Sequence, residues 1–230
     1  EDSMTAPTLT AYRCLSSVFA CRLRVTQLHS DGTLDPGTAN QYTSDALISI
    51  GTSPQVETGA EITLRNGCGD VCVEVAGDDE VKRYNLTLSL CQLDVELLYL
   101  MAGGYLLTKG GITVGMAERK IGDARPKVVV EAWSEARTRA QQAVHTSGSG
   151  LLYWRHVWPF VEWTPGDYTL QNDALSVPLT GKAQENANMG VGPASDWPAV
   201  ITSAQAKFLD DNIPAATCGL ASFAVSGSAS

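Results

Sequence analysis

The sequence has few of the residues from which metal sites and nucleophilic active sites are built. It contains three histidines in 230 residues, and its six cysteines, at positions 14, 21, 68, 72, 91 and 218, form no CxxC pair and no familiar zinc spacing. No histidine lies close in sequence to Cys68 and Cys72. We therefore expect no bound metal. The cysteines should serve as small apolar side chains, with a Cys68–Cys72 disulfide as an alternative outside a reducing compartment.

The sequence also lacks the motifs that usually carry catalysis. It has no phosphate-binding loop of the Walker type, no HExxH and no GxSxG nucleophile elbow. The segment GVGPAS (190–195) begins like a dinucleotide fingerprint, but it lacks the third glycine and has a proline where a helix should start. We expect no enzymatic activity and no cofactor. Glycoside hydrolysis by a pair of carboxylates stays open as an alternative.

Long hydrophobic runs and an export signal are missing as well. The longest apolar cluster, from Leu97 to Leu107, is interrupted by Gly103 and Gly104, so it is too short to span a bilayer. The opening residues, EDSMTAPT, have neither the basic start nor the apolar stretch of a secretion signal. These features predict a protein that is made in the cytoplasm and makes no membrane contact.

The residues that are present suit a folded domain with an uneven charge. Hydrophobic residues make up 44% of the chain and charged residues 18%, and the net charge is −9. Residues 1–80 hold twelve acids and four bases, whereas residues 81–230 hold thirteen and twelve. Such an acidic region argues against binding nucleic acid, because binders place Lys and Arg on the contact face. The acids are densest in one stretch, namely Glu57, Glu61, Asp70, Glu74, Asp78, Asp79 and Glu80.

Alternating apolar residues and turn signals predict a mainly β fold with one short helix. In YNLTLSL (84–90), every second residue is leucine, which is typical of a strand with one buried face. The next segment predicts a short helix, with Asp94 as its N-cap and Gly103 at its end. ALISIG and GAEITLRNG read as two short strands joined by a polar loop, TSPQVET (52–58).

One predicted strand, LLYWRHVWPFVEW (151–163), is apolar on both faces. Simple alternation places Trp154, Trp158 and Phe160 on one face, and Tyr153, Val157, Val161 and Trp163 on the other. A strand of this kind lies in the centre of a sandwich or is covered by a neighbouring chain. The aromatic candidates for a subunit contact are Trp154, Trp158, Phe160 and Trp163.

Several of these segments together resemble the major tail tube proteins of long-tailed bacteriophages, most closely those of phages that infect actinobacteria. The resemblance extends, with gaps, over roughly residues 21–198. It is carried by RVTQLHSDG, by the succession RNGCGDVC, KRYNLTL, a cysteine, a helix and GG, by the tryptophan-rich segment, and by LTGKAQEN followed by GVGP. Residues 199–230 lie outside it.

The resemblance implies a β-sandwich or barrel with one flanking helix, formed by a single domain that covers residues 1–230. An N-terminal arm (1–20) and a C-terminal extension (199–230) would belong to it. Six copies would form a ring whose inner sheets join into a continuous barrel, and a loop would reach from one ring to the next. The rings would stack into a tube in the virion tail, assembled in the host cytoplasm. This tube would enclose the tape measure protein and meet tail terminator and distal tail proteins at its ends.

In such a tube, genomic DNA passes through without specific binding, and the acidic stretch fits that role. We expect some of its seven acids to face the lumen or a junction between rings, since like charge disfavours adsorption of phosphates. The alternative for the acids is an outer face in solvent. The alternative for the whole chain is a β-sandwich decoration or adhesin module that binds a capsid or a cell surface.

Overall fold

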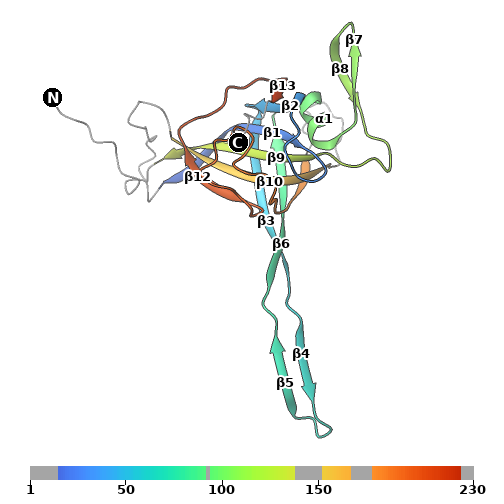
Figure 1. The fold of residues 1–230 in the computed structure, drawn as a ribbon, viewed down its shortest axis with the longest axis vertical. Coiled ribbons are helices and arrows are strands. Elements are labelled where there is room, and N and C mark those ends of the chain that lie inside the picture. Colours follow the sequence, from blue (N-terminus) through green and yellow to red (C-terminus); the bar gives the residue numbers. More distant parts are fainter. Residues whose placement is uncertain (1–14, 92–93, 138–151, 167–177, 224–230) are drawn as a thin grey trace, which may run out of the picture.

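The computed structural model describes residues 15–91, 94–137, 152–166 and 178–223, and it is mainly β. Thirteen strands and one helix, α1 (Val95–Ala102), lie in these residues (Figure 1). The strands are β1 (Ser16–Leu28), β2 (Gly37–Ser44), β3 (Leu47–Glu57), β4 (Glu61–Arg65), β5 (Val71–Ala76), β6 (Glu80–Leu90), β7 (Tyr105–Lys109), β8 (Ile112–Ala117), β9 (Lys127–Arg137), β10 (Tyr153–Pro165), β11 (Leu179–Ala183), β12 (Ala206–Asp210) and β13 (Leu220–Phe223). The expected β-rich fold with one short helix is confirmed for this part of the chain.

Nine of the strands form one antiparallel sheet, in the order β13-β2-β1-β9-β10-β11-β6-β3, with β12 paired to β10. The sheet is strongly curved, because β1 and β3 are distant in this order yet contact each other. Its concave side encloses the main core, which includes Leu23, Leu88 and Trp163 and is covered by α1. A second, smaller core on the other side lies under the segment 184–205 and includes Trp197 and Ile201. We call this structure the body.

The helix forms where its sequence signals predict. The Asp94 carboxylate accepts hydrogen bonds from the backbone N–H groups of Glu96 (2.9 Å) and Leu97 (3.2 Å), which satisfies donors of the first turn. The Tyr42 hydroxyl donates to the same carboxylate, and this bond and burial raise the pKa of Tyr42. Gly103, at a φ of 79°, ends the helix. The N-terminal end of α1 is thus bonded to β2 through Tyr42.

The leucine alternation in β6 is also confirmed. Leu86, Leu88 and Leu90 are buried in the main core, whereas Asn85 and Thr87 between them are exposed. The strand pairs with β11 on one side and with β3 on the other. One face of β6 therefore packs into the main core, and the strand lies between β11 and β3 in the sheet.

One expected element differs in the structure. Segment 52–58 is not a loop, because residues 52–57 belong to β3 and pair with β6 as far as Glu57↔Glu80. Within the expected C-terminal extension (199–230), β12 pairs with β10 and β13 pairs with β2. Within the expected N-terminal arm (1–20), residues 16–20 lie in β1, and residues 1–14 lie outside the described part. Whether these two segments act as an arm and an extension stays a prediction.

The tryptophan-rich strand β10 does not keep one alternation along its length. Its register against β9 shifts between Trp158 and Val161, where Pro159 lacks the N–H that a ladder needs. As a result Trp158 shares the main core with Val161 and Trp163, whereas Phe160 packs against the smaller core. The expected grouping of Phe160 with Trp158 is therefore wrong. The burial of Trp158 and Trp163 is accounted for within a single chain, whereas Trp154 and Phe160 remain half-buried.

Candidate functional site

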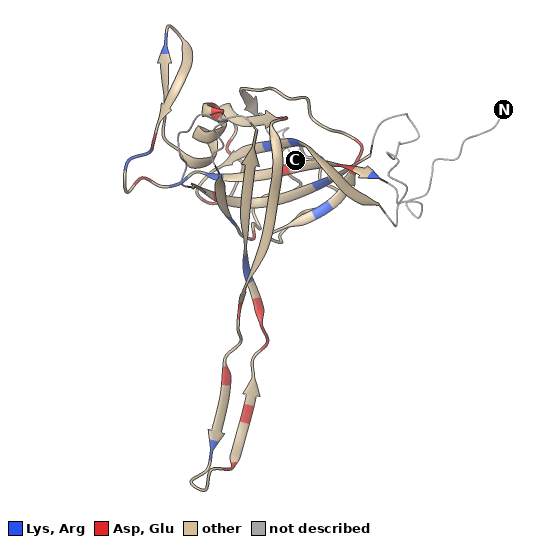
Figure 2. Cartoon of the chain, turned by 180° about the vertical axis from the view of Figure 1, so that it is seen from behind, with Lys and Arg blue, Asp and Glu red and all other residues tan. Residues whose placement is uncertain are grey.

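The most prominent feature outside the body is a long hairpin, residues 57–80, which we call the arm. It continues the ribbon formed by β3 and β6 and projects away from the body (Figures 1 and 2). Strands β4 and β5 pair with each other along it and with no other strand in the described residues. Every residue of the arm is exposed except Gly59, which is half-buried. Nothing in the part of the chain that the structure describes covers either face of this hairpin.

The arm is amphipathic even though both of its faces are exposed. Directly opposed residues in an antiparallel pair point to the same face, and residues two apart in a strand share that face. One face carries four apolar side chains that are 45–57% exposed, in the pairs Ile62↔Val75 and Leu64↔Val73. The other face carries the pairs Glu61↔Ala76 and Thr63↔Glu74. The arm thus presents an apolar face and an acidic face back to back.

The structure brings all seven acids of the predicted stretch together on the arm (Figure 2). Glu57 accepts a 2.5 Å hydrogen bond from the Lys82 ammonium, which lowers the pKa of the Glu57 carboxyl. Asp79 accepts from the Gly59 backbone N–H (3.2 Å). No ion pair of the described residues involves the other six acids. Whether these acids face a lumen or a ring junction in an assembly stays a prediction.

The tip of the arm is a hydrogen-bonded turn. The Asn66 side-chain oxygen accepts from the backbone N–H groups of Cys68 and Asp70, both at 2.9 Å. Gly69 has a φ of 91°, which favours glycine there. Cys68 and Cys72 are exposed free thiols. The described residues contain no group of three His, Cys, Asp or Glu side chains placed to hold a metal ion.

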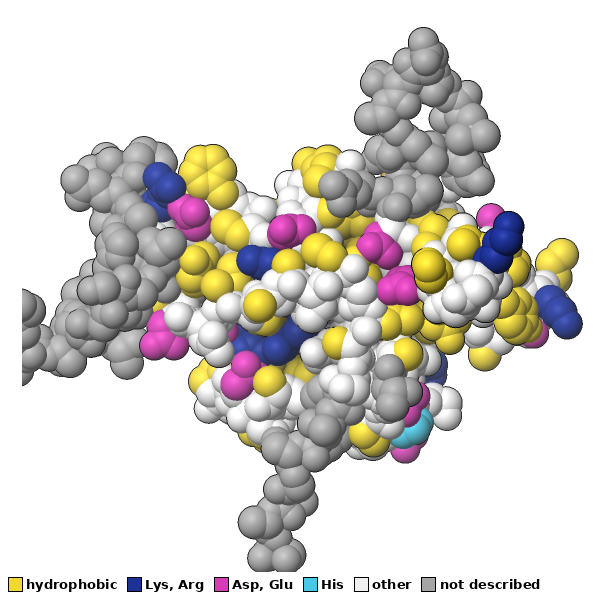
Figure 3. Space-filling model, turned by 90° about the horizontal axis from the view of Figure 1, so that it is seen from above, with side chains coloured by type: hydrophobic (Ala, Val, Ile, Leu, Met, Phe, Trp, Pro, Cys, Tyr) yellow, Lys and Arg dark blue, Asp and Glu magenta, His cyan; other side chains and the backbone are white. Residues whose placement is uncertain are grey.

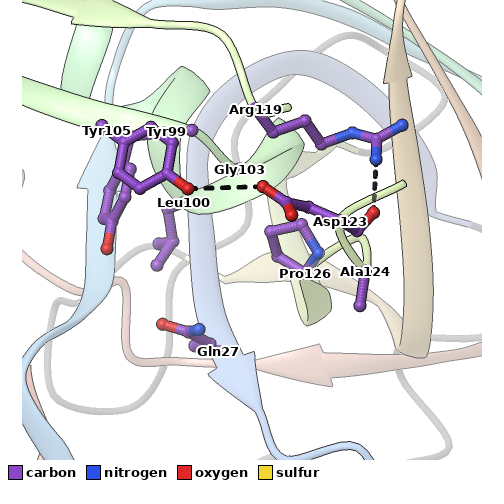
Figure 4. A pocket seen from close by; sticks show the side chains of 10 residues that line it. Gln27, Tyr99, Leu100, Gly103, Tyr105, Arg119, Asp123, Ala124 and Pro126 are labelled. Carbon is purple, nitrogen blue, oxygen red and sulfur yellow. Dashed lines mark hydrogen bonds between the residues drawn. The ribbon is translucent and has the colours of Figure 1, made fainter. Parts of the chain in front are cut away.

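A second hairpin, β7–β8, leaves the body beside α1 on the side away from the arm (Figure 1). A pocket of about 210 Å³ lies at its base, between the end of α1 and the segment 118–126 (Figure 4). There the Tyr105 hydroxyl donates to the Asp123 carboxylate (3.3 Å), and the Arg119 guanidinium donates to the Asp123 carbonyl (2.5 Å). These side chains bond to one another across the pocket, so their role is to hold the base of this hairpin.

A larger groove of about 460 Å³ lies on the body between the start of β1 and the first half of β3. We call it the seam groove. Its rim includes Phe19 and Ile48, which are 65% and 57% exposed, and its wall includes Trp158. The ring of His156 lies against Trp158, and its Nε2 is 3.4 Å from the Ser134 hydroxyl. Burial and the nearby Lys207 ammonium lower the pKa of His156.

This corner does not form a hydrolytic triad. A serine nucleophile needs a histidine that a third group, usually a carboxylate, holds in place. The Ser17 hydroxyl is 3.5 Å from His156 Nε2 and 2.5 Å from the Ser134 hydroxyl, but the groove lining contains no acid. The seam groove therefore has an apolar rim and a polar corner around His156.

Sequence reasoning missed a buried cluster of charges on the convex side of the sheet, under the segment 184–205. Glu131 is fully buried and accepts hydrogen bonds from Arg24 (2.5 Å) and Arg155 (2.5 Å). Arg155 also donates to Asp196 (2.8 Å) and Asp210 (2.9 Å). The two guanidinium groups hold the pKa of Glu131 down to about 2 against the opposing effect of burial.

This charge cluster connects segments that are far apart in the sequence. Trp197 donates to Glu131 (2.8 Å), and Trp133, over which both guanidinium groups lie, donates to Asp210 (3.2 Å). The cluster therefore anchors residues 184–210 to the central strands β1, β9 and β10. Its only sequence signal was Glu131 within the apolar run KVVVEAW, because a lone charge in a buried strand must find a partner.

Neither the models of known protein families nor the curated proteins contain a match to this chain. None of the chain that the structure describes forms a helix with the length and apolar character needed to cross a bilayer. The features on which a function can be argued are therefore the arm, the sheet edges and the seam groove of a mainly β body.

Proposed function

We propose that this chain is the structural subunit of a tail tube of the kind found in long-tailed bacteriophages. Six copies close into a ring, and rings stack into a hollow tube that conducts the genome. The resemblance of the sequence, the mainly β body with one flanking helix, and the presence of a long projecting hairpin support this proposal. The chain then works by assembly and makes or breaks no bond.

The observation that carries the proposal is the exposed apolar face of the arm. A lone two-stranded ribbon is only marginally stable in water, and it gains stability when its apolar face is covered. The four side chains Ile62, Leu64, Val73 and Val75 have no such cover among the described residues. An uncovered apolar surface on a projecting element is typical of a site for association with another chain. In the proposed tube, this partner is a copy in the next ring.

The position of the arm also suits an assembly that repeats along one axis. The arm leaves one end of the body only, so the surface that it contacts on a neighbour differs from the arm itself. Such a heterologous contact does not close on itself along the stacking direction, so it can be repeated from ring to ring. Other proteins, namely a tail terminator and a distal tail protein, would then end the tube.

The edges of the sheet support closure around the ring. The sheet ends in β3 on one side and β13 on the other, and neither edge pairs further within the described residues. Open strand edges favour pairing with another chain, and a closed ring of subunits removes them. Edge pairing between neighbours would also build a continuous barrel around the lumen, where the tape measure protein lies before the genome passes.

The acidic face of the arm is compatible with a conduit for DNA. Proteins that hold DNA neutralise its phosphates with Lys and Arg, whereas this face carries Glu61 and Glu74. Near the lumen or at a ring junction, these acids would leave passing DNA unbound. The proposed location is the virion tail, after assembly in the host cytoplasm.

Electron microscopy of the purified full-length chain at increasing concentration tests the proposal. We expect hexagonal rings and tubes, and we expect Ile62→Ser with Leu64→Ser to abolish the tubes because the apolar face is lost. The matched control is Thr63→Ala, on the opposite face of the same strand, which should still form tubes. A chain that stays monomeric at high concentration would refute the proposal, and discrete trimers would instead favour a decoration or adhesin module.

A further inference from the structure

The seam groove lies where the curved sheet fails to close. Along Ser16–Ala20, β1 pairs with β9 on one side only, because its pairing with β2 covers Leu23–Thr26. Strand β3 pairs with β6 on one side only. The lining of the groove comes largely from these two segments, residues 17–20 and 48–52. Within the described residues, the groove thus has an unpaired strand edge on each side.

The lining of this groove combines eight apolar residues with six polar ones. Phe19 and Ile48 are the exposed apolar residues of the rim, and Ile50 and Ala20 lead inward to the main core. Seen from the end opposite the arm, the surface of the body otherwise mixes apolar and charged side chains (Figure 3). Phe19 also has a positive φ of 53° at a register shift of β1, and the Arg137 guanidinium lies 5.0 Å from the centre of its ring. The rim of the groove therefore offers Phe19 and Ile48 for apolar contact.

The charge of the groove is opposite to that of the arm. The ionisable side chains in the lining are Lys207, which is exposed and forms no ion pair in the described part of the chain, and His156. The arm carries seven acids against one base, Arg65. Such an opposition speeds encounter between two surfaces and disfavours the reversed orientation.

The arm and the groove also lie at opposite ends of one ribbon. Strand β3 contributes residues 48–52 to the groove, then runs to Glu57, where the arm begins. At about 3.3 Å per residue, the nine residues from Glu57 to the turn at Asn66 span about 30 Å. The arm points away from its own body, so it does not reach its own groove (Figure 1). A head-to-tail assembly requires this arrangement, with the inserting arm at one end of the ribbon and the groove that receives an arm at the other end.

We propose that the seam groove is the docking site for the arm of a second copy of this chain. The apolar face of the incoming arm packs on Phe19 and Ile48, and its acidic face remains outside. This inference rests on the proposed function, since it names the surface through which one ring would hold the next.

A photocrosslinking experiment on the full-length chain tests the inference. Benzoylphenylalanine replaces Val73 on the apolar face or, as the control, Thr63 on the acidic face, in a mixture of light and heavy isotope-labelled protein. After assembly, we expect Val73→benzoylphenylalanine to give crosslinks to residues 16–20 and 48–52 between light and heavy chains. The control should give few crosslinks to these residues. Assembled tubes in which Val73 crosslinks elsewhere, or only within one chain, would overturn the docking site while leaving the proposed function intact.

A pair of substitutions gives a second readout. Ile48→Asp places a charge on the rim of the groove, and Ile112→Asp places the same charge on β8, where the isoleucine is 70% exposed. Both side chains point to solvent in the single chain, so we expect both variants to fold. Ile48→Asp should raise the concentration needed for tube formation by about tenfold or more, because it removes a central apolar contact. Equal effects of the two substitutions would overturn the docking site, and a wild-type chain that never assembles would overturn the proposed function as well.

Discussion

The body and the arm are both built from β-strands, but they differ in how their apolar side chains are covered and how their charged side chains are paired. In the body, Leu88 is 1% exposed, and the buried Glu131 has two arginine partners. In the arm, Leu64 is 57% exposed, and Glu74 has no ion-pair partner among the described residues. The body therefore buries its main core within the described chain, whereas the arm leaves its apolar face exposed there. Stability should depend on the first region and assembly on the second.

The largest expected contrast concerns charge. Glu131→Gln leaves the buried guanidinium groups of Arg24 and Arg155 without their shared carboxylate, and we expect it to lower the free energy of unfolding by about 3–5 kcal/mol. The matched change on the arm, Glu74→Gln, should alter it by less than about 0.5 kcal/mol. Urea denaturation of both variants measures the difference. If the two variants unfolded at the same urea concentration, the charge cluster would have no role in stability.

Leucine truncation gives the next contrast. Leu88→Ala opens a cavity in the main core and should cost about 2–5 kcal/mol of unfolding free energy. Leu64→Ala removes a side chain that is already in solvent, so the stability of the single chain should change by less than about 0.5 kcal/mol. Thermal unfolding at a concentration that keeps the chain monomeric is the appropriate measurement. A large loss with Leu64→Ala would show that the arm packs on its own body.

The smallest contrast is in the response to acid. The pKa of Glu131 falls from 4.5 to about 2 on folding, so its contribution to stability is present above pH 4.5 and is lost as the pH falls toward 2. At pH 4 its contribution should be about 1 kcal/mol smaller than at pH 7. Measuring the free energy of unfolding of wild type and Glu131→Gln over this pH range isolates the contribution of Glu131, since the variant should lack this part of the acid dependence. Parallel curves for the two proteins would contradict the lowered pKa.

The alternation of apolar residues predicted the strands in both regions but not their burial. In YNLTLSL and in GAEITLRNG the same period of two occurs, yet the leucines of the first are buried and Ile62 and Leu64 of the second are exposed. A period of two indicates only that one face of the strand is apolar and the other is polar. What covers that face depends on other strands, and for the arm no other strand of the described chain is near.

The register shift in β10 and the charge cluster were beyond the reach of sequence patterns for a related reason. The shift at Pro159 moves Trp158 into the same core as Val161, although the two differ in parity along the strand. The cluster joins Glu131 to Arg24 and Asp196, which are far apart in the sequence. The register shift and the charge cluster both depend on which strands are neighbours in the sheet, and a single sequence does not specify these neighbours.

The sequence by itself determined the local elements of this protein. The cap at Asp94, the stop at Gly103 and the leucines of β6 act within a few residues, through hydrogen bonds and side-chain periodicity that neighbours in the chain supply. Only the tertiary structure decided that residues 57–80 leave the body as an arm, and that the sheet stays open between β1 and β3. Those outcomes follow from long-range strand pairing, whose energy depends on contacts between residues that local patterns do not relate.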